Sequence, residues 1–213
     1  KTRSVPAGLN QNYNSVRRVL VKSDGTYTVF LLARDSGGLN RLYRSTDRAQ
    51  SFVQVNGLGG YEGDVWAPRD GGSDVYLLRG DSLYKSTNNG DTWTLEGSLG
   101  SGSSEGELAG SEDGAPRFYA IVRIGGNRRL YRSDDAGVSW SDLAGVSDYW
   151  GTLNASIIDQ DLFAWGGVEV HRTFNGGSTF SIVNSWTEYY NNPPAKLHAD
   201  VPGLDVLPDG MGG

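Results

Sequence analysis

The chain has 213 residues, with 25 acidic residues against 19 Lys and Arg and a formal net charge of -6. This charge argues against a nucleic-acid or anionic-membrane partner, because both need a basic face. The absence of cysteine excludes disulfides and cysteine-based metal sites, and apolar runs of at most about six residues are too short for a membrane span. The 31 Gly, 6 Trp and 11 Tyr beside one Met favour short strands and many turns over helices.

Four successive segments repeat the same order of short strands and turns. They cover approximately residues 14–57, 61–98, 104–145 and 150–185. The first reads VRRVLVKSD, TYTVFLLARD, LNRLYRSTD and SFVQVN, with strands of about five to seven residues between Asp- and Gly-rich turns. Four antiparallel strands recurring at a fixed period predict an all-β fold, a β-propeller of four-stranded blades.

One turn recurs in all four segments, within YRSTDRAQSF, YKSTNNGDTW, YRSDDAGVSW and HRTFNGGSTF. The turns begin at Ser45, Ser86, Ser133 and Thr173, with spacings of 41, 47 and 40 residues. We expect the Asp or Asn at the third position to accept backbone N–H groups two residues on, and the Gly that follows to tolerate positive φ. We expect the closing aromatic residue to anchor the turn by packing. A structural turn is favoured over the alternative of a ligand or calcium site. The repeated residues are Ser45, Asp47, Phe52, Ser86, Asn88, Gly90, Trp93, Ser133, Asp135, Gly137, Trp140, Thr173, Asn175, Gly177 and Phe180.

These turns resemble the Asp box, or bacterial neuraminidase repeat, of sialidases, sortilin-type receptor domains and several secreted glycoside hydrolases. The resemblance covers residues 39–185, with Ala49 in place of Gly and with Asn88 and Asn175 in place of Asp. It implies a propeller in which the box is a folding element that lies away from the active site. It also implies an extracellular or cell-surface protein, and we expect a signal peptide to have been removed before Lys1. The Arg-Ile-Pro segment typical of sialidases is absent, so true sialidase activity is not expected.

The residues after the fourth segment, 186–213, are expected to form a linker and then the first strand of a fifth blade at residues 204–207. His198-Ala199-Asp200 resembles the His-x-Asp element that opens a blade in sortilin-type propellers, although Pro202 stands where a second His commonly follows. A lone first strand leaves unpaired edges. We therefore expect this chain to be part of a larger ring, with the remaining blades in another chain or fragment.

Strand direction separates two faces of such a fold. The start of each first strand and the turn between the second and third strands share one face, and the Asp-box turns lie on the other. We expect ligands on the first face. Binding candidates there are Arg17, Arg34, Arg79, Arg123, Trp150, Asn154 and His198. The carboxylate candidates are Glu62, Asp64, Glu105, Glu107 and Asp200.

Two functions are compatible with these candidates. A binding module would present its rim to a protein or a glycan. A glycoside hydrolase, sialidase-like or endo-glucanase-like, would need two of the five carboxylates about 5 Å or about 6.5–9.5 Å apart, one with a raised pKa. We favour the binding module, because no catalytic signature is visible in the four segments.

No metal or cofactor is expected. The two histidines are His171 and His198, and a zinc site would have to gather carboxylates from several blades. His171 occupies the strand position that Tyr43, Tyr84 and Tyr131 hold elsewhere, which predicts a packing role.

Overall fold

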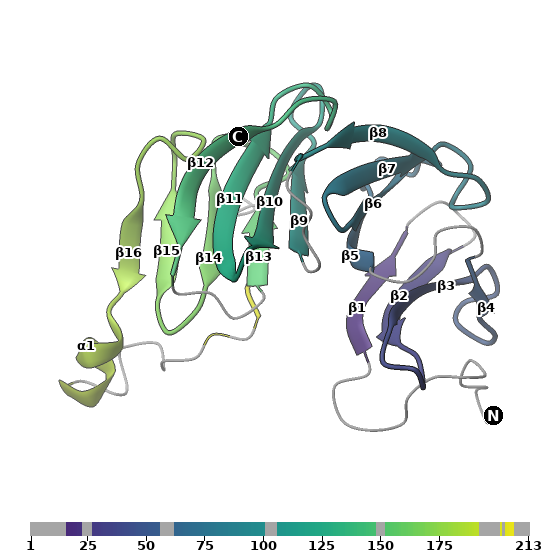
Figure 1. The fold of residues 1–213 in the computed structure, drawn as a ribbon, viewed down its shortest axis with the longest axis horizontal. Coiled ribbons are helices and arrows are strands. Elements are labelled where there is room, and N and C mark those ends of the chain that lie inside the picture. Colours follow the sequence, from purple (N-terminus) through teal and green to yellow (C-terminus); the bar gives the residue numbers. More distant parts are fainter. Residues whose placement is uncertain are drawn as a thin grey trace. The chain divides into compact units, whose positions relative to one another are not determined.

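A computed structural model describes residues 16–22, 27–55, 62–100, 106–147, 152–191, 201 and 203–206. Its strands form four four-stranded antiparallel sheets, each made of strands that follow one another in the chain (Figure 1). This all-β arrangement confirms the predicted blades of a β-propeller. The chain divides into two compact units, Lys1–Gly106 and Glu107–Gly213.

The first unit contains two blades with strand orders β1-β2-β3-β4 and β5-β6-β7-β8. The second strands, β2 and β6, are buried along nearly their whole length, whereas β4 is exposed. The strands are β1 Val16–Val21, β2 Val29–Arg34, β3 Asn40–Ser45, β4 Val53–Gln54, β5 Glu62–Trp66, β6 Val75–Arg79, β7 Ser82–Ser86 and β8 Thr94–Ser98.

The second unit repeats this pattern, with β9 beginning at the boundary between the units. Its sheets are ordered β12-β11-β10-β9 and β13-β14-β15-β16. The strands are β9 Gly106–Ser111, β10 Arg117–Ile124, β11 Asn127–Ser133, β12 Ser141–Val146, β13 Thr152–Ala155, β14 Phe163–Gly166, β15 Val170–Thr173 and β16 Ser181–Asn184.

Two features after the fourth blade differ from expectation. Residues 186–191 form a short helix, α1 Trp186–Asn191, in what was expected to be linker; its one and a half turns are too short to show a helical period. The expected strand at 204–207 is not formed over 204–206, because a strand requires a hydrogen-bonded neighbour, and residue 207 lies outside the described part. In the described part of the chain, no helix is long and apolar enough to cross a membrane.

The core of the first unit lies between its two blades. Phe30, Leu32 and Leu42 of the first blade pack against residues of the second blade that include Val65 and Leu77. All five side chains are almost fully buried, so this apolar contact is the main attraction between the two sheets.

A buried lysine adds a polar link between the same two sheets. Lys22 follows β1 and is 2% exposed. Its Nζ donates hydrogen bonds to Gly72 O at 2.6 Å, Asp74 O at 2.9 Å and Asn89 Oδ1 at 3.0 Å. A buried ammonium group is stable only when its donors are satisfied, and here all three acceptors belong to the second blade.

The second unit uses aromatic contacts and a different set of polar ones. The rings of Tyr119 and Phe163 stack with their centroids 3.8 Å apart, and the Tyr119 hydroxyl donates to Gln160 O at 2.7 Å. Burial raises the pKa of Tyr119. His171 stacks on Trp165 at 4.8 Å, which is the packing role expected for it.

Candidate functional site

Each Asp-box turn is closed by its own side chains. In the first copy, the Ser45 hydroxyl donates to Asp47 Oδ1 at 2.7 Å and accepts from Ala49 N at 2.9 Å. Asp47 Oδ1 accepts from Ser51 N at 2.9 Å, and Oδ2 accepts from the Ser51 hydroxyl at 2.6 Å. The expected acceptor role of Asp47 is therefore present, but its backbone donors lie three and four residues on and not two, because the chain makes a wider turn.

The two turns with Asn at the third position form the same arrangement of hydrogen bonds. Asn88 Oδ1 accepts from Thr92 N at 2.9 Å, and Asn88 Nδ2 donates to the Thr92 hydroxyl at 2.9 Å. The amide replaces the carboxylate because the residue four positions on has a hydroxyl that can accept as well as donate. Asn175 and Thr179 make the corresponding pair.

Two consecutive residues of each turn have positive φ, one more than expected from the sequence. The pairs are Arg48 and Ala49, Asn89 and Gly90, Ala136 and Gly137, and Gly176 and Gly177. Because the left-handed region favours residues without a Cβ, Ala49 is held there at a cost that Gly90, Gly137 and Gly177 avoid.

The carboxylates at the third position of these turns, Asp47 and Asp135, have a lowered pKa. The hydrogen bond from the Ser51 hydroxyl, followed by that from Ser45, lowers the pKa of Asp47 well below its usual range. The Ser139 hydroxyl and its backbone N–H similarly lower the pKa of Asp135. Each bond favours the charged form because the carboxylate is the better acceptor.

The opposite rim carries the three arginines expected at the ends of second strands. Arg34 and Arg79 are half-buried and Arg123 is exposed. The Arg79 guanidinium carbon lies 5.9 Å from the centre of the Tyr84 ring. Arg34 and Arg79 belong to the first unit and Arg123 to the second.

Of the five carboxylate candidates, the structure describes the side chains of Asp64 and Glu107. Asp64 is 1% exposed, and its Oδ1 lies 3.5 Å from Arg18 Nε and accepts from Val65 N at 2.8 Å. This environment gives Asp64 a structural role between β1 and β5. Glu107 is half-buried at the start of β9. Glu105 and Asp200 lie outside the described residues, and of Glu62 only the backbone is described.

The remaining binding candidates are only partly described. Asn154 lies in β13, where its Nδ2 donates to Leu204 O at 3.2 Å and to Asp205 Oδ1 at 3.0 Å. Its amide therefore binds residues of the same chain. Trp150 and His198 lie outside the described residues, and of Arg17 only the backbone is described.

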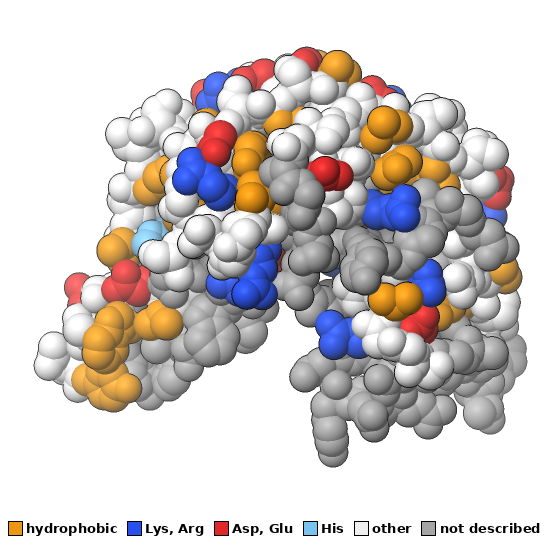
Figure 2. All heavy atoms as spheres, in the orientation of Figure 1, with side chains coloured by type: hydrophobic (Ala, Val, Ile, Leu, Met, Phe, Trp, Pro, Cys, Tyr) orange, Lys and Arg blue, Asp and Glu red, His pale blue; other side chains and the backbone are white. Residues whose placement is uncertain are grey.

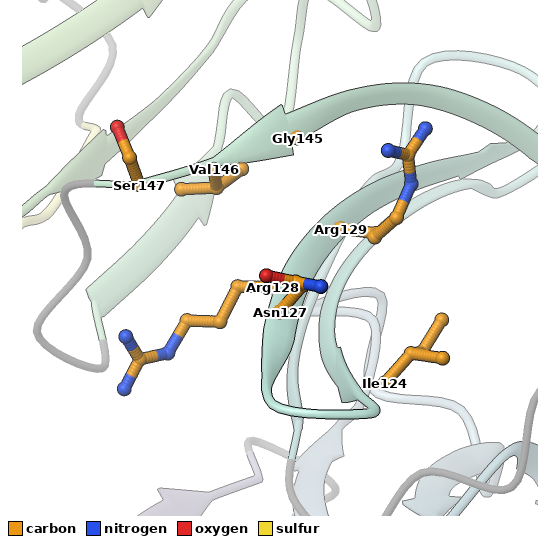
Figure 3. Close-up of a pocket in the computed structure, with 7 residues that line it drawn as sticks. All are labelled: Ile124, Asn127, Arg128, Arg129, Gly145, Val146 and Ser147. Atoms are coloured by element: carbon orange, nitrogen blue, oxygen red, sulfur yellow. The ribbon is translucent and has the colours of Figure 1, made fainter.

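A pocket of about 490 Å³ lies on the rim opposite the Asp-box turns, at the β10–β11 turn and the end of β12 (Figure 3). Its volume falls in the range of small-ligand sites, about 300–1,000 Å³. Among the described residues, the lining contains two arginines and no carboxylate. The residues are Ile124, Asn127, Arg128, Arg129, Gly145, Val146 and Ser147.

The two arginines of this pocket have different surroundings, and their side chains point in different directions in Figure 3. Arg129 donates from Nε and Nη2 to the two carboxylate oxygens of Asp142, at 2.7 and 2.6 Å, and this raises the pKa of Arg129. Arg128 is half-buried and lies directly opposite Val146 in the β11–β12 ladder. It also lies opposite Arg123 in the β10–β11 ladder.

The pocket was not identified among the sequence candidates beyond its neighbour Arg123. The signal for it is the pair Arg128-Arg129, which follows Gly125-Gly126 after one intervening residue, Asn127. Recognising it from sequence would have required knowing that the end of β12 folds back beside this turn.

Exposed hydrophobic side chains gather at one other place in the second unit. Trp186 and Tyr190 of α1 are 44% and 69% exposed, with perpendicular rings 5.9 Å apart. Figure 2 shows hydrophobic side chains over α1 at the lower left, whereas elsewhere on this face acidic, basic and hydrophobic side chains are interspersed.

Comparisons with known proteins define the fold more firmly than the function. No protein-family profile and no curated protein matches the chain. A chain in the crystal structure of a nidogen/laminin complex superposes with a TM-score of 0.62 over 90% of this chain and 68% of that chain, at 9% identity. An ancestral GH74 enzyme superposes with a TM-score of 0.61 over 86% of this chain, at 14% identity, and the match spans 25% of that enzyme. At these identities the likeness shows the fold alone, and the chain is therefore a β-propeller whose Asp-box family is a prediction from sequence.

Proposed function

We propose that this protein is a binding module, secreted or displayed at the cell surface, whose ligand is a protein with exposed acidic side chains. The pocket at the β10–β11 turn carries the proposal. It lies on the rim where a propeller ligand is expected, and its described lining residues provide guanidinium groups and include no carboxylate. Planar guanidinium groups match the geometry of a carboxylate.

The lining favours a protein over a stacked sugar. None of the seven described lining residues is aromatic, so these residues offer no ring on which the apolar face of a sugar could stack. Asp142 accepts two hydrogen bonds from Arg129. We assign the ligand carboxylate to Arg128, whose side chain points in another direction in Figure 3. The likeness to a chain of the nidogen/laminin complex supports a protein partner.

The alternative function is glycoside hydrolysis on the same rim. Likeness to the GH74 enzyme supports it at the level of fold. Asp64 is a poor candidate for the catalytic acid or base, because its carboxylate is buried and paired with Arg18. The binding module is therefore preferred.

Binding to peptide arrays tests the proposal. The array would hold Asp- and Glu-rich peptides beside matched Asn and Gln peptides, with a glycan array run in parallel. We expect binding to acidic peptides alone, and a loss of about ten-fold or more in Arg128→Gln. Arg69→Gln, an exposed arginine before β6, is the matched control and should bind normally. Equal binding by Arg128→Gln, binding to glycans alone, or polysaccharide cleavage would each overturn the proposal.

A further inference from the structure

One hydrogen bond between blades occurs in both units. Its donor is the arginine that directly precedes the residue opening an Asp-box turn. Its acceptor is the backbone carbonyl three residues into the turn of the following blade. Arg44 Nη1 donates to Asn89 O at 2.6 Å in the first unit, and Arg132 Nη1 donates to Gly176 O at 2.8 Å in the second. The turns therefore also connect successive blades.

The fourth blade carries the same arginine without this acceptor. Arg172 directly precedes Thr173, as Arg132 precedes Ser133. Its Nε is buried and has no hydrogen-bond partner among the residues that the structure describes, an unfavourable state for a charged donor. Its guanidinium carbon lies 4.6 Å from the centre of the Phe174 ring, and Phe174 is 59% exposed. Arg172 is therefore placed to donate to a further turn.

The same blade also holds the residues expected to begin a fifth blade. Val201 N donates to Gly167 O at 2.8 Å. The Asn154 side chain binds Leu204 O and Asp205 Oδ1, at 3.2 and 3.0 Å. Val201 thus lies beside the end of β14, and Leu204 and Asp205 lie beside β13.

The first unit contains an equivalent arrangement, in which the first strand of one blade lies beside the preceding blade. There β5, the first strand of the second blade, meets β1 through the ion pair of Asp64 with Arg18. Asp64 stands in the sequence Gly-Asp-Val-Trp, and Asp205 stands in the similar sequence Leu-Asp-Val-Leu. By this equivalence, residues 204–206 occupy the place of a first strand, although no second strand pairs with them in the described structure.

We propose that the face of the fourth blade formed by Asn154, Arg172 and Phe174 receives a three-stranded β-sheet that carries an Asp-box turn. Residues 204–206 become the first strand of that blade by pairing with the incoming sheet, and Arg172 donates to the carbonyl three residues into its turn. A complete four-stranded blade would not fit, because residues 201–205 already occupy the position of its first strand. This inference does not depend on the ligand of the rim pocket.

A peptide of residues 75–98, which spans β6 to β8 and the second Asp-box turn, is a suitable probe. It provides three strands without a first strand, and its Asn89 carbonyl is the acceptor that Arg44 uses. Fluorescence anisotropy would measure its binding to the 213-residue chain, and hydrogen exchange would follow the amides of residues 203–206. We expect saturable binding below about 1 mM, with slower exchange at these amides.

Variants of the chain distinguish the proposed contact from nonspecific binding of the peptide. Arg172→Ala should weaken binding about ten-fold or more, Arg172→Lys should retain part of it, and Arg69→Gln should bind as wild type. Near-ultraviolet circular dichroism would verify that each variant is folded. The proposal is overturned by no binding at about 1 mM, by equal affinity in Arg172→Ala, or by unchanged exchange at residues 203–206.

Discussion

Two substitutions at the same position of two Asp-box turns, Ala49→Gly and Gly90→Ala, test whether positive φ limits the stability of this protein. The position has φ of +60° at Ala49 and +83° at Gly90. Left-handed backbone costs a residue with a Cβ about 1–2 kcal/mol. Replacing alanine with glycine offsets about 0.5–1 kcal/mol of this cost, because glycine raises the entropy of the unfolded chain. We expect Ala49→Gly to raise the free energy of unfolding by about 0.5–1 kcal/mol.

The reciprocal change, Gly90→Ala, adds a steric clash. A Cβ at Gly90 would lie 2.8 Å from Cε1 and 3.1 Å from Cζ of Phe30, a fully buried residue of the first unit's core. Overpacking of a core costs about 1–3 kcal/mol. Added to the backbone cost, this predicts that Gly90→Ala lowers the free energy of unfolding by about 2–4 kcal/mol.

Urea unfolding followed by tryptophan fluorescence measures both effects, with hydrogen exchange in β2 and β6 as a readout specific to the first unit. Gly38→Ala is the matched control, because Gly38 has φ of +84° and a Cβ there would meet nothing within 4 Å. If Gly90→Ala costs no more than Gly38→Ala, the contact with Phe30 is not the cause. If Ala49→Gly is destabilising, the reasoning from positive φ is refuted.

Two further predictions concern polar groups. Lys22→Met keeps the buried apolar stem but removes three hydrogen bonds to the second blade, so unfolding in urea should show a loss of about 2–4 kcal/mol; an unchanged midpoint would contradict this. Asp47 and Asp135 have a lower pKa in the folded state than in the unfolded state. Their contribution to stability is therefore present above the unfolded pKa of about 3.9 and is lost as the pH falls toward the folded pKa. The double variant Asp47→Asn/Asp135→Asn should lose less stability than wild type between about pH 5 and pH 2, and equal losses in thermal melts would argue against this assignment.

The Asp-box turns could be predicted from sequence because their contacts are local. The bonds that close the first copy join Ser45, Asp47, Ala49 and Ser51, which lie within seven consecutive residues. The period of these turns then predicted the blades. What the pattern could not indicate is the reach of Asp47 to the residue four positions on, since that distance depends on two consecutive residues with positive φ.

The candidate site was predicted less completely, because its geometry depends on residues far apart in the chain. The sequence does not show whether the carboxyl group of Asp64 is buried or exposed to a ligand. In the structure it is buried and paired with Arg18. The pocket at Arg128 forms because Val146 and Ser147 return beside the β10–β11 turn. No local sequence pattern predicts that these two residues lie beside the turn.

The sequence by itself determined the repeat, the all-β class and the turn that opens each outer strand, since these follow from contacts between near neighbours and from alternating strand direction. Only the tertiary structure decided which charged groups become structural and which remain on a surface. Lys22 and Arg44 look like ordinary solvated cations in the sequence, yet both reach acceptors on the next blade, 45 or more residues away. Such contacts exist only once two sheets have packed, because burial is what makes an unsatisfied donor costly and its partner necessary.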